Sequence, residues 1–178
     1  VNFPYMWEVE EKDGETFFLQ QLNAIPKAIR DSICGILIET YQGWGACSYP
    51  MSFIKAIEKF CLEEKIVLAF DEMQAGFYRT GKKFGFQHYD VNPDLICIGK
   101  GMGAGLPLSG IIGKNEIMDL ALEGELSSTH SCNPISCAAG NTVIEVMQSS
   151  EFKSNLKSNV NLFNFRGKAL IEKFSFLR

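Results

Sequence analysis

Four short apolar runs stand in the middle of the chain, at residues 33–38, 66–70, 95–98 and 109–112. Strands covered on both faces give such unbroken apolar runs, whereas half-exposed strands alternate apolar and polar residues. The four runs therefore predict an α/β fold, with a mainly parallel sheet and helices on both of its faces.

The stretches between and after these runs have helical spacing. Ser52 is the predicted N-cap of a helix whose apolar residues share one face: Phe53, Ile54, Ile57, Phe60 and Cys61. Asn133-Pro134 predicts another helix start, since asparagine favours the N-cap and proline the first helical position, and this helix runs to about Gln148. Residues 17–29 and 152–174 are further helical candidates.

Composition narrows the class of protein. The 178 residues are 46% hydrophobic and carry a net charge of −4, which favours a packed soluble domain and does not favour nucleic-acid binding. No apolar run has the length of a membrane span. Six cysteines without a C-x-x-C pair predict reduced thiols in a cytoplasmic protein, and with only two histidines no metal site is predicted.

Two of the apolar runs end close to a charged residue, Asp71 after the second and Lys100 after the third. A strand that simply meets water shows the same pattern. However, ligands of such sheets lie beyond the carboxyl ends of the strands. A lysine and a carboxylate that face one crevice match the needs of pyridoxal phosphate, which requires an amine for a Schiff base and an acid at its ring nitrogen.

The residues around Lys100 admit a second interpretation. Glycines on both sides of the lysine allow a cofactor to approach the backbone closely. Gly99-x-Gly101-x-x-Ala104 also fits the dinucleotide-binding fingerprint, but that motif must open a helix, and here it leads into another apolar run. A nicotinamide-binding domain is thus the weaker alternative. The hydroxyl-rich residues 127–131 fit a phosphate seat and plain helix capping equally well.

Several segments together resemble the class III pyridoxal-phosphate-dependent aminotransferases, with the 4-aminobutyrate aminotransferase-like branch nearest. The resemblance covers about residues 33–148, and its motifs occur in family order: Ile38-Glu39 with Gln42-Gly43, residues 71–81, Pro93-Asp94-Leu95, Gly99-Lys100-Gly101, residues 107–110, Ser128-Thr129-His130 and Asn133-Pro134. It implies the large domain of the fold-type I transferases and a ping-pong reaction that moves an amino group from an amine or amino acid to a 2-oxo acid.

Carried over residue by residue, the resemblance assigns five cofactor-binding positions. Lys100 would form the Schiff base and shuttle a proton, and Asp71 would pair with the pyridinium nitrogen. Gln74 would lie near the phenolic oxygen and Met73 against a face of the ring. Thr129 would reach the phosphate of the cofactor held by the neighbouring subunit, because the family places its sites at a homodimer interface.

Substrate selection is less defined. Glu39 would lie near the substrate end of the site, although a strand-end residue in a local ion pair explains it as well. Trp44 stands where 4-aminobutyrate-like members carry a glutamate, and Thr40 stands where the family has a proline. Tryptophan cannot pair with an arginine, so the amino donor and acceptor stay open, and an aromatic residue suits a less polar amine.

The family's members are more than twice this length, so we interpret the chain, which begins at Val1, as a central fragment that is inactive alone. Residues 1–148 would belong to the cofactor-binding large domain, and residues 149–178 would form a helix leading to a small domain. A non-catalytic truncated remnant of such an enzyme is the alternative.

Overall fold

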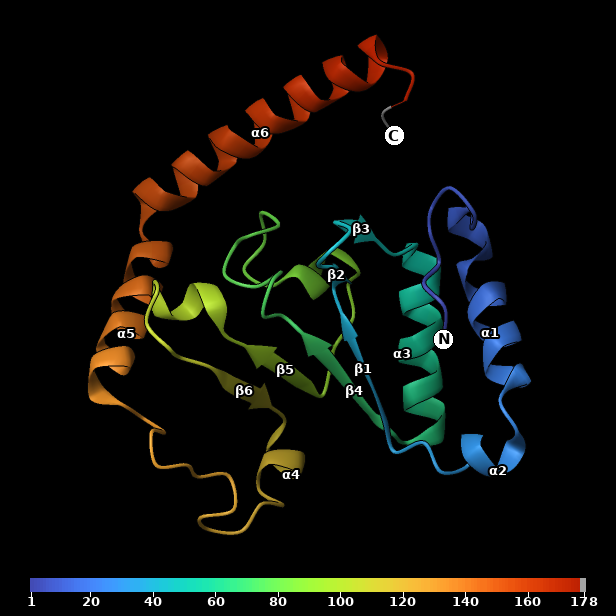
Figure 1. Ribbon diagram of the computed structural model, residues 1–178, viewed down its shortest axis with the longest axis horizontal. Helices are drawn as coiled ribbons and strands as arrows, with labels where there is room; N and C mark the ends of the chain where they lie inside the picture. Colours follow the sequence, from blue (N-terminus) through green and yellow to red (C-terminus); the bar gives the residue numbers. More distant parts are fainter. Residues whose placement is uncertain (177–178) are drawn as a thin grey trace.

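The computed structural model describes residues 1–176 and contains a four-stranded sheet flanked by helices (Figure 1). Its strands are β1 (Gly35–Glu39), β4 (Val67–Asp71), β5 (Leu95–Ile98) and β6 (Gly110–Gly113), in the order β1-β4-β5-β6. β1, β4 and β5 are parallel and β6 is antiparallel to β5. The predicted α/β class and mainly parallel sheet are confirmed.

The remaining elements surround this sheet. A small hairpin of β2 (Tyr41–Gln42) and β3 (Cys47–Ser48) follows β1. The helices are α1 (Gly14–Ala24), α2 (Lys27–Arg30), α3 (Met51–Glu64), α4 (Asn115–Met118), α5 (Pro134–Gln148) and α6 (Ser150–Lys173). Short 3-10 turns occupy Glu11–Asp13, Gly85–His88 and Lys100–Gly103.

The hydrophobic core lies between one face of the sheet and the helices α1 and α3. Phe18 of α1 and Phe53 of α3 meet edge to face, with ring centroids 5.8 Å apart. From the sheet, Leu68 and Phe70 of β4 enter the same cluster. Because side chains alternate along a strand, the neighbours of these two residues point to the opposite face.

The predicted N-cap of α3 is wrong. Pro50 occupies the N-cap position, and Ser52 lies inside the first turn of the helix. The Ser52 hydroxyl donates to the backbone oxygen of Glu11, and Glu11 Oε1 accepts from the Ser52 amide at 3.2 Å. Ser52 therefore fastens α3 to the N-terminal segment rather than starting the helix.

Asp94 clamps the amino edge of the sheet. Its Oδ2 accepts from the backbone amide of Leu68 at 2.8 Å, and its Oδ1 accepts from Lys114 Nζ at 2.6 Å. The Asp94 amide in turn donates to the Leu68 oxygen at 2.8 Å. One aspartate thus joins β4 to the segment that follows β6.

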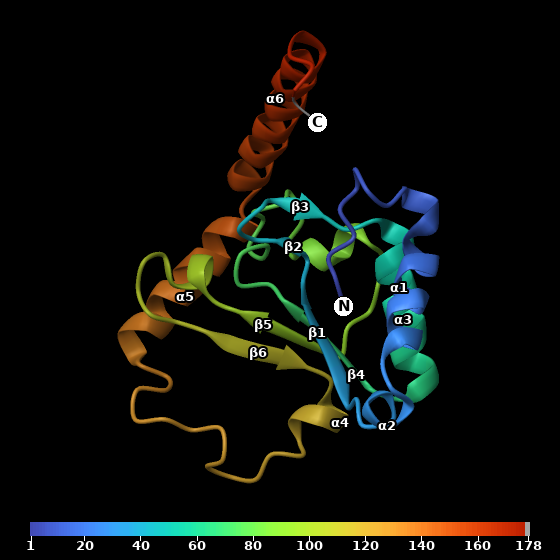
Figure 2. The ribbon, with the colours of Figure 1, turned by 45° about the vertical axis from the view of Figure 1, so that its right-hand side comes forward.

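α5 lies on the other side of the sheet from α1 and α3 (Figures 1 and 2). The predicted start of α5 is confirmed, because Asn133 Oδ1 accepts from the amides of Ile135 and Ser136. α6, predicted for residues 152–174, extends away from the sheet (Figure 2). Residues 177 and 178, which the expected C-terminal unit of residues 149–178 includes, lie outside the described residues.

Candidate functional site

Three chemically active side chains belong to one edge of the sheet. Glu39 and Asp71 are register partners at the last position of β1 and β4, and Asp71 is also the partner of Cys97 on β5. Lys100 follows three residues after Cys97. Because the three strands are parallel, their carboxyl ends bring Glu39, Asp71 and the lysine turn to the same edge.

The alternation of side chains along each strand also determines the face of the sheet on which Glu39 and Asp71 lie. Phe70 points into the core under α3, so the adjacent Asp71 points to the opposite face. Leu37, two residues before Glu39, shares that face and is 63% exposed. Burial raises the pKa of the Cys97 thiol, and the Asp71 carboxylate adds to the shift. Asp71 and Cys97 are register partners, so both side chains leave the sheet on this open face.

Lys100 is held in an unusual backbone conformation. Its φ is +43°, in the left-handed region that non-glycine residues seldom adopt, and it opens the 3-10 turn that ends at Gly103. Such strain tends to gather at functional sites. The Lys100 side chain is exposed, and its amine takes part in none of the ion pairs found among residues 1–176.

The loop after β4 packs against the lysine turn. Met73 lies so close to Gly99 that a Cβ on that glycine would stand 2.4 Å from the Met73 sulfur. A Cβ on Gly101 would stand 3.7 Å from the Cβ of Phe77. Asp71 Oδ1 accepts from the Met73 amide at 2.9 Å, which fixes the start of this loop. Asp71, Met73 and Lys100 are therefore parts of one packed unit.

Glu39 and Gln74 both lie beside Gly43, in the turn of the β2–β3 hairpin. Glu39 Oε2 accepts from the Gly43 amide at 2.5 Å. A Cβ placed on Gly43 would lie 3.2 Å from Glu39 Oε2 and 3.7 Å from Gln74 Cγ. The local hydrogen bond of Glu39 is made to backbone, and no lysine or arginine among residues 1–176 forms an ion pair with it.

Trp44 and Thr129 are both exposed, in segments other than the loop after β4 and the lysine turn. Trp44 is 84% exposed in the turn of the hairpin. Thr129 is exposed in the segment between α4 and α5, which Figure 1 shows looping out below β6. In the part of the chain that the structure describes, no hydrogen bond joins Thr129 to another predicted site residue.

Glu72 is a residue that the sequence analysis missed. Its side chain is fully buried and accepts hydrogen bonds from Thr40 Oγ1 and from the amides of Gly85 and Phe86, the latter two at 2.8 Å each. The signal that could have found it is the alternation of β4, which puts Glu72 in phase with the core residues Leu68 and Phe70.

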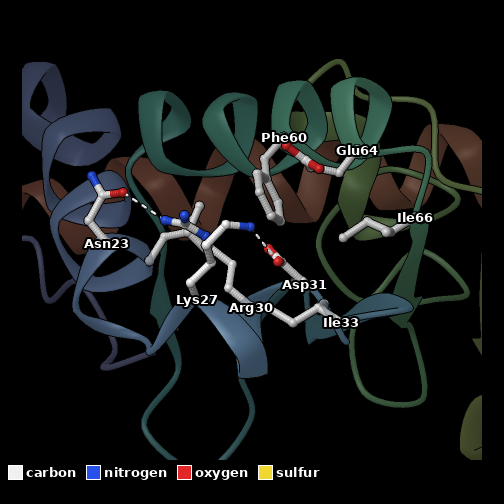
Figure 3. Close-up of a pocket in the computed structure, with 9 residues that line it drawn as sticks. Asn23, Lys27, Arg30, Asp31, Ile33, Phe60, Glu64 and Ile66 are labelled. Atoms are coloured by element: carbon white, nitrogen blue, oxygen red, sulfur yellow. Dashed lines mark hydrogen bonds and ion pairs between the residues drawn. The ribbon is translucent and has the colours of Figure 1, made fainter.

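A pocket of about 500 Å³ lies at the opposite edge of the sheet (Figure 3). Ile33 and Ile66, which precede β1 and β4, line it, together with charged residues of α2 and its surroundings. Most of these charged side chains bind other residues of the pocket: Lys27 forms an ion pair with Asp31, and Arg30 donates to Asn23 Oδ1 at 3.1 Å. None of the predicted site residues lines it.

Three further observations concern dinucleotide binding, metal binding and a membrane span. The turn at Lys100–Gly103 is a short 3-10 segment followed by β6, whereas the dinucleotide fingerprint must open an α-helix. Among residues 1–176, no group of three or more His, Cys, Asp or Glu side chains is placed to hold a metal ion. No helix of the described chain is both long and apolar enough to cross a membrane.

Sequence comparisons give consistent matches. The family model described as aminotransferase class-III matches residues 1–175. A probable 4-aminobutyrate aminotransferase of Bacillus subtilis is 36% identical over 153 residues, which are 82% of this chain and 35% of that protein. An acetylornithine aminotransferase of Methanocaldococcus jannaschii is 33% identical over 88% of this chain and 40% of its own length. The chain thus spans well under half the length of these relatives.

Solved structures agree. The taurine:2-oxoglutarate aminotransferase of Bifidobacterium kashiwanohense, determined in complex with PLP and glutamate, superposes with a TM-score of 0.81 at 25% identity. The match covers 96% of this chain and 41% of that one. A transaminase from the marine bacterium Virgibacillus gives a TM-score of 0.80 at 25% identity, over 90% of this chain and 38% of its own.

Proposed function

This chain belongs to the class III aminotransferase family, and from that premise we propose that the protein is a pyridoxal-phosphate-dependent transaminase. It would move an amino group from an amine or amino acid to a 2-oxo acid, with Lys100 as the cofactor-binding lysine. The observation that carries the proposal is the shared sheet edge, where Asp71 and the strained Lys100 turn belong to one packed unit.

The groups present fit this cofactor. Lys100 offers an exposed amine free of the ion pairs described above, which an aldehyde needs for covalent attachment. Asp71 offers a carboxylate on the open face for the ring nitrogen, and Met73 supplies a soft apolar surface between the two. When bound, pyridoxal phosphate would supply an electron sink for the bond that breaks at the substrate carbon.

Each residue would then have a separate task. Lys100 Nζ would hold the cofactor at rest and carry a proton to and from the substrate carbon. Asp71 would keep the ring nitrogen protonated, because an adjacent negative charge favours the charged form of a base. Gln74 would donate to the phenolic oxygen, and Thr129 would bind phosphate in the site of a neighbouring subunit.

Substrate, assembly and location are extensions of the same proposal. Glu39, beside Gln74 and Gly43, would face the substrate end, with Trp44 as an apolar contact for the amine. The protein would act as a cytoplasmic homodimer. Residues 1–148 would form part of the cofactor-binding domain, and α6 would lead to a small domain. Because relatives are much longer, activity would belong to the full-length protein.

Chemical trapping tests the role of Lys100. The full-length protein, loaded with pyridoxal phosphate and reduced with borohydride, should carry the cofactor on Lys100, as located by peptide mass spectrometry. Lys100→Ala should abolish the label. Lys65→Ala is a matched control, because Lys65 is also an exposed lysine with a positive φ, of 55°, but caps the far end of α3.

Two results would contradict the proposal. One is a label that persists at full stoichiometry in Lys100→Ala. The other is a wild-type protein that binds no pyridoxal phosphate although it is folded to the same extent as Lys65→Ala. A truncated remnant without activity would be recognised by stop codons in the DNA that flanks this coding segment.

A further inference from the structure

A buried hydrogen bond lies directly behind the two acidic residues of the site. Thr40 follows Glu39 and Glu72 follows Asp71, and Thr40 Oγ1 donates to Glu72 Oε1. Thr40 is 3% exposed and Glu72 is completely buried. The bond therefore ties β1 to β4 one residue beyond their last register pair, Glu39 and Asp71.

Both partners of this bond are fixed from other directions. Glu72 accepts from the amides of Gly85 and Phe86, and its own amide donates to the Cys97 oxygen at 2.9 Å. The Thr40 oxygen accepts from the Tyr89 hydroxyl at 2.9 Å. A buried carboxylate is stable only when its oxygens are satisfied in this way, so its position is narrowly defined.

Packing around Thr40 is equally close. A Cβ on Gly85 would stand 2.6 Å from Thr40 Cγ2 and 2.9 Å from the Cβ of Ala75. The backbone at Gly85 therefore lies against the Thr40 methyl group, while its amide binds Glu72. The Thr40 methyl group thus contacts the Gly85 turn, and the Thr40 hydroxyl binds the Glu72 carboxylate to which that turn also donates. Together these contacts leave the Thr40 side chain little freedom to rotate.

We propose that Thr40 and Glu72 are positioning residues of the site. Their hydrogen bond fixes the direction in which the adjacent Glu39 and Asp71 side chains leave the sheet. The role of those two carboxylates rests on the proposed function, whereas their orientation is a property of the protein alone.

Amide hydrogen exchange in the full-length protein without cofactor tests the orientation. The reporters are the Gly43 amide, which Glu39 accepts from, and the Met73 amide, which Asp71 accepts from. The internal reference is the Leu68 amide, which donates to Asp94 near the amino end of β4, away from Asp71. Thr40→Ala and Thr40→Ser lose the same methyl group and differ only in the hydroxyl.

We expect Thr40→Ala to speed exchange at Gly43 and Met73 about tenfold or more, with Leu68 changed less than about threefold. Thr40→Ser should stay within about threefold of wild type at all three amides. If Thr40→Ala does not fold, Thr40→Val, which keeps the side-chain shape without the hydroxyl, replaces it. Equal exchange in the Ala and Ser variants, or a uniform rise at all three amides, would overturn the proposal.

The holoprotein gives a second readout. Thr40→Ala should lower kcat about tenfold with KM within about threefold, and Thr40→Ser should restore kcat, since a misplaced group acts on the reaction more than on binding. Identical kcat in the Ala and Ser variants would contradict the proposal. A wild-type protein without cofactor at Lys100 would defeat the proposed function alone, because the exchange comparison needs no cofactor.

Discussion

Glu39 and Asp71 are Cα partners at the ends of parallel strands, yet their carboxylates are bound to different loops. Glu39 accepts from the Gly43 amide in the hairpin, and Asp71 accepts from the Met73 amide beside the lysine turn. Two like charges on neighbouring strands are thus directed to separate partners. This divergence predicts separate functions for the pair.

Isosteric neutral variants separate the two roles. Asp71→Asn should lower kcat by about 10²-fold or more for every substrate, because it removes the charge that, in the proposed function, would face the ring nitrogen. Glu39→Gln should change kcat/KM less than about tenfold, and differently for different amino donors. Steady-state kinetics with several donors measures both effects. Equal and substrate-independent losses in the two variants would show that the carboxylates act as one group.

The Asp94 clamp is expected to stabilise the sheet. Asp94→Ala should lower the free energy of unfolding by about 1–3 kcal/mol, because the Leu68 amide loses its acceptor. Lys114→Ala should cost less than about 1 kcal/mol, since the Lys114 side chain is 41% exposed and water replaces the ion pair. Urea unfolding of the full-length protein gives both values. A larger loss in Lys114→Ala would mean that the ion pair dominates.

Alkaline pH should weaken the fold through Tyr49. Burial, with smaller contributions from Tyr89 and Glu39, raises the pKa of Tyr49 to about 12. An unfolded tyrosine ionises near pH 10, so the stabilisation is complete below about pH 10 and is lost as the pH rises from about 10 to about 12. Unfolding curves at these two pH values should show a smaller loss for Tyr49→Phe, by on the order of 1 kcal/mol. An identical loss in both proteins would place the titration elsewhere.

The features that could be predicted from the sequence are those determined by residues close together in the chain. The cap of α5 is local, because Asn133 accepts from amides only two and three residues further along. The apolar runs before Asp71 and Lys100 form strands, and their pattern is contained within about five residues each. The helical candidate at residues 17–29 is divided instead, since Pro26 separates α1 from α2. These features need no knowledge of distant residues.

Features made between distant residues were not predictable in the same way. Ser52 has the composition of an N-cap, but its hydroxyl binds Glu11, which lies 41 residues earlier in the chain. The alternation of β4 puts Glu72 in phase with the core, but its hydrogen-bond partners, Thr40 and the amides of Gly85 and Phe86, come from distant parts of the chain. The assigned roles of all the predicted site residues, Gln74, Trp44 and Thr129 among them, stay predictions, since they depend on a cofactor, a substrate and a second subunit.

The antiparallel course of β6 bears on how the lysine moves. The segment from Gly99 to Ser109 leaves β5 and re-enters the sheet on the adjacent strand, so its two ends are anchored about 5 Å apart. Pairing of β5 with β6 thus tethers both ends of the connection that carries Lys100 to the sheet. If Lys100 has the proposed role, it would therefore reach the cofactor and its substrates mainly by turning its own side chain, above a backbone turn that is tethered to the sheet on both sides.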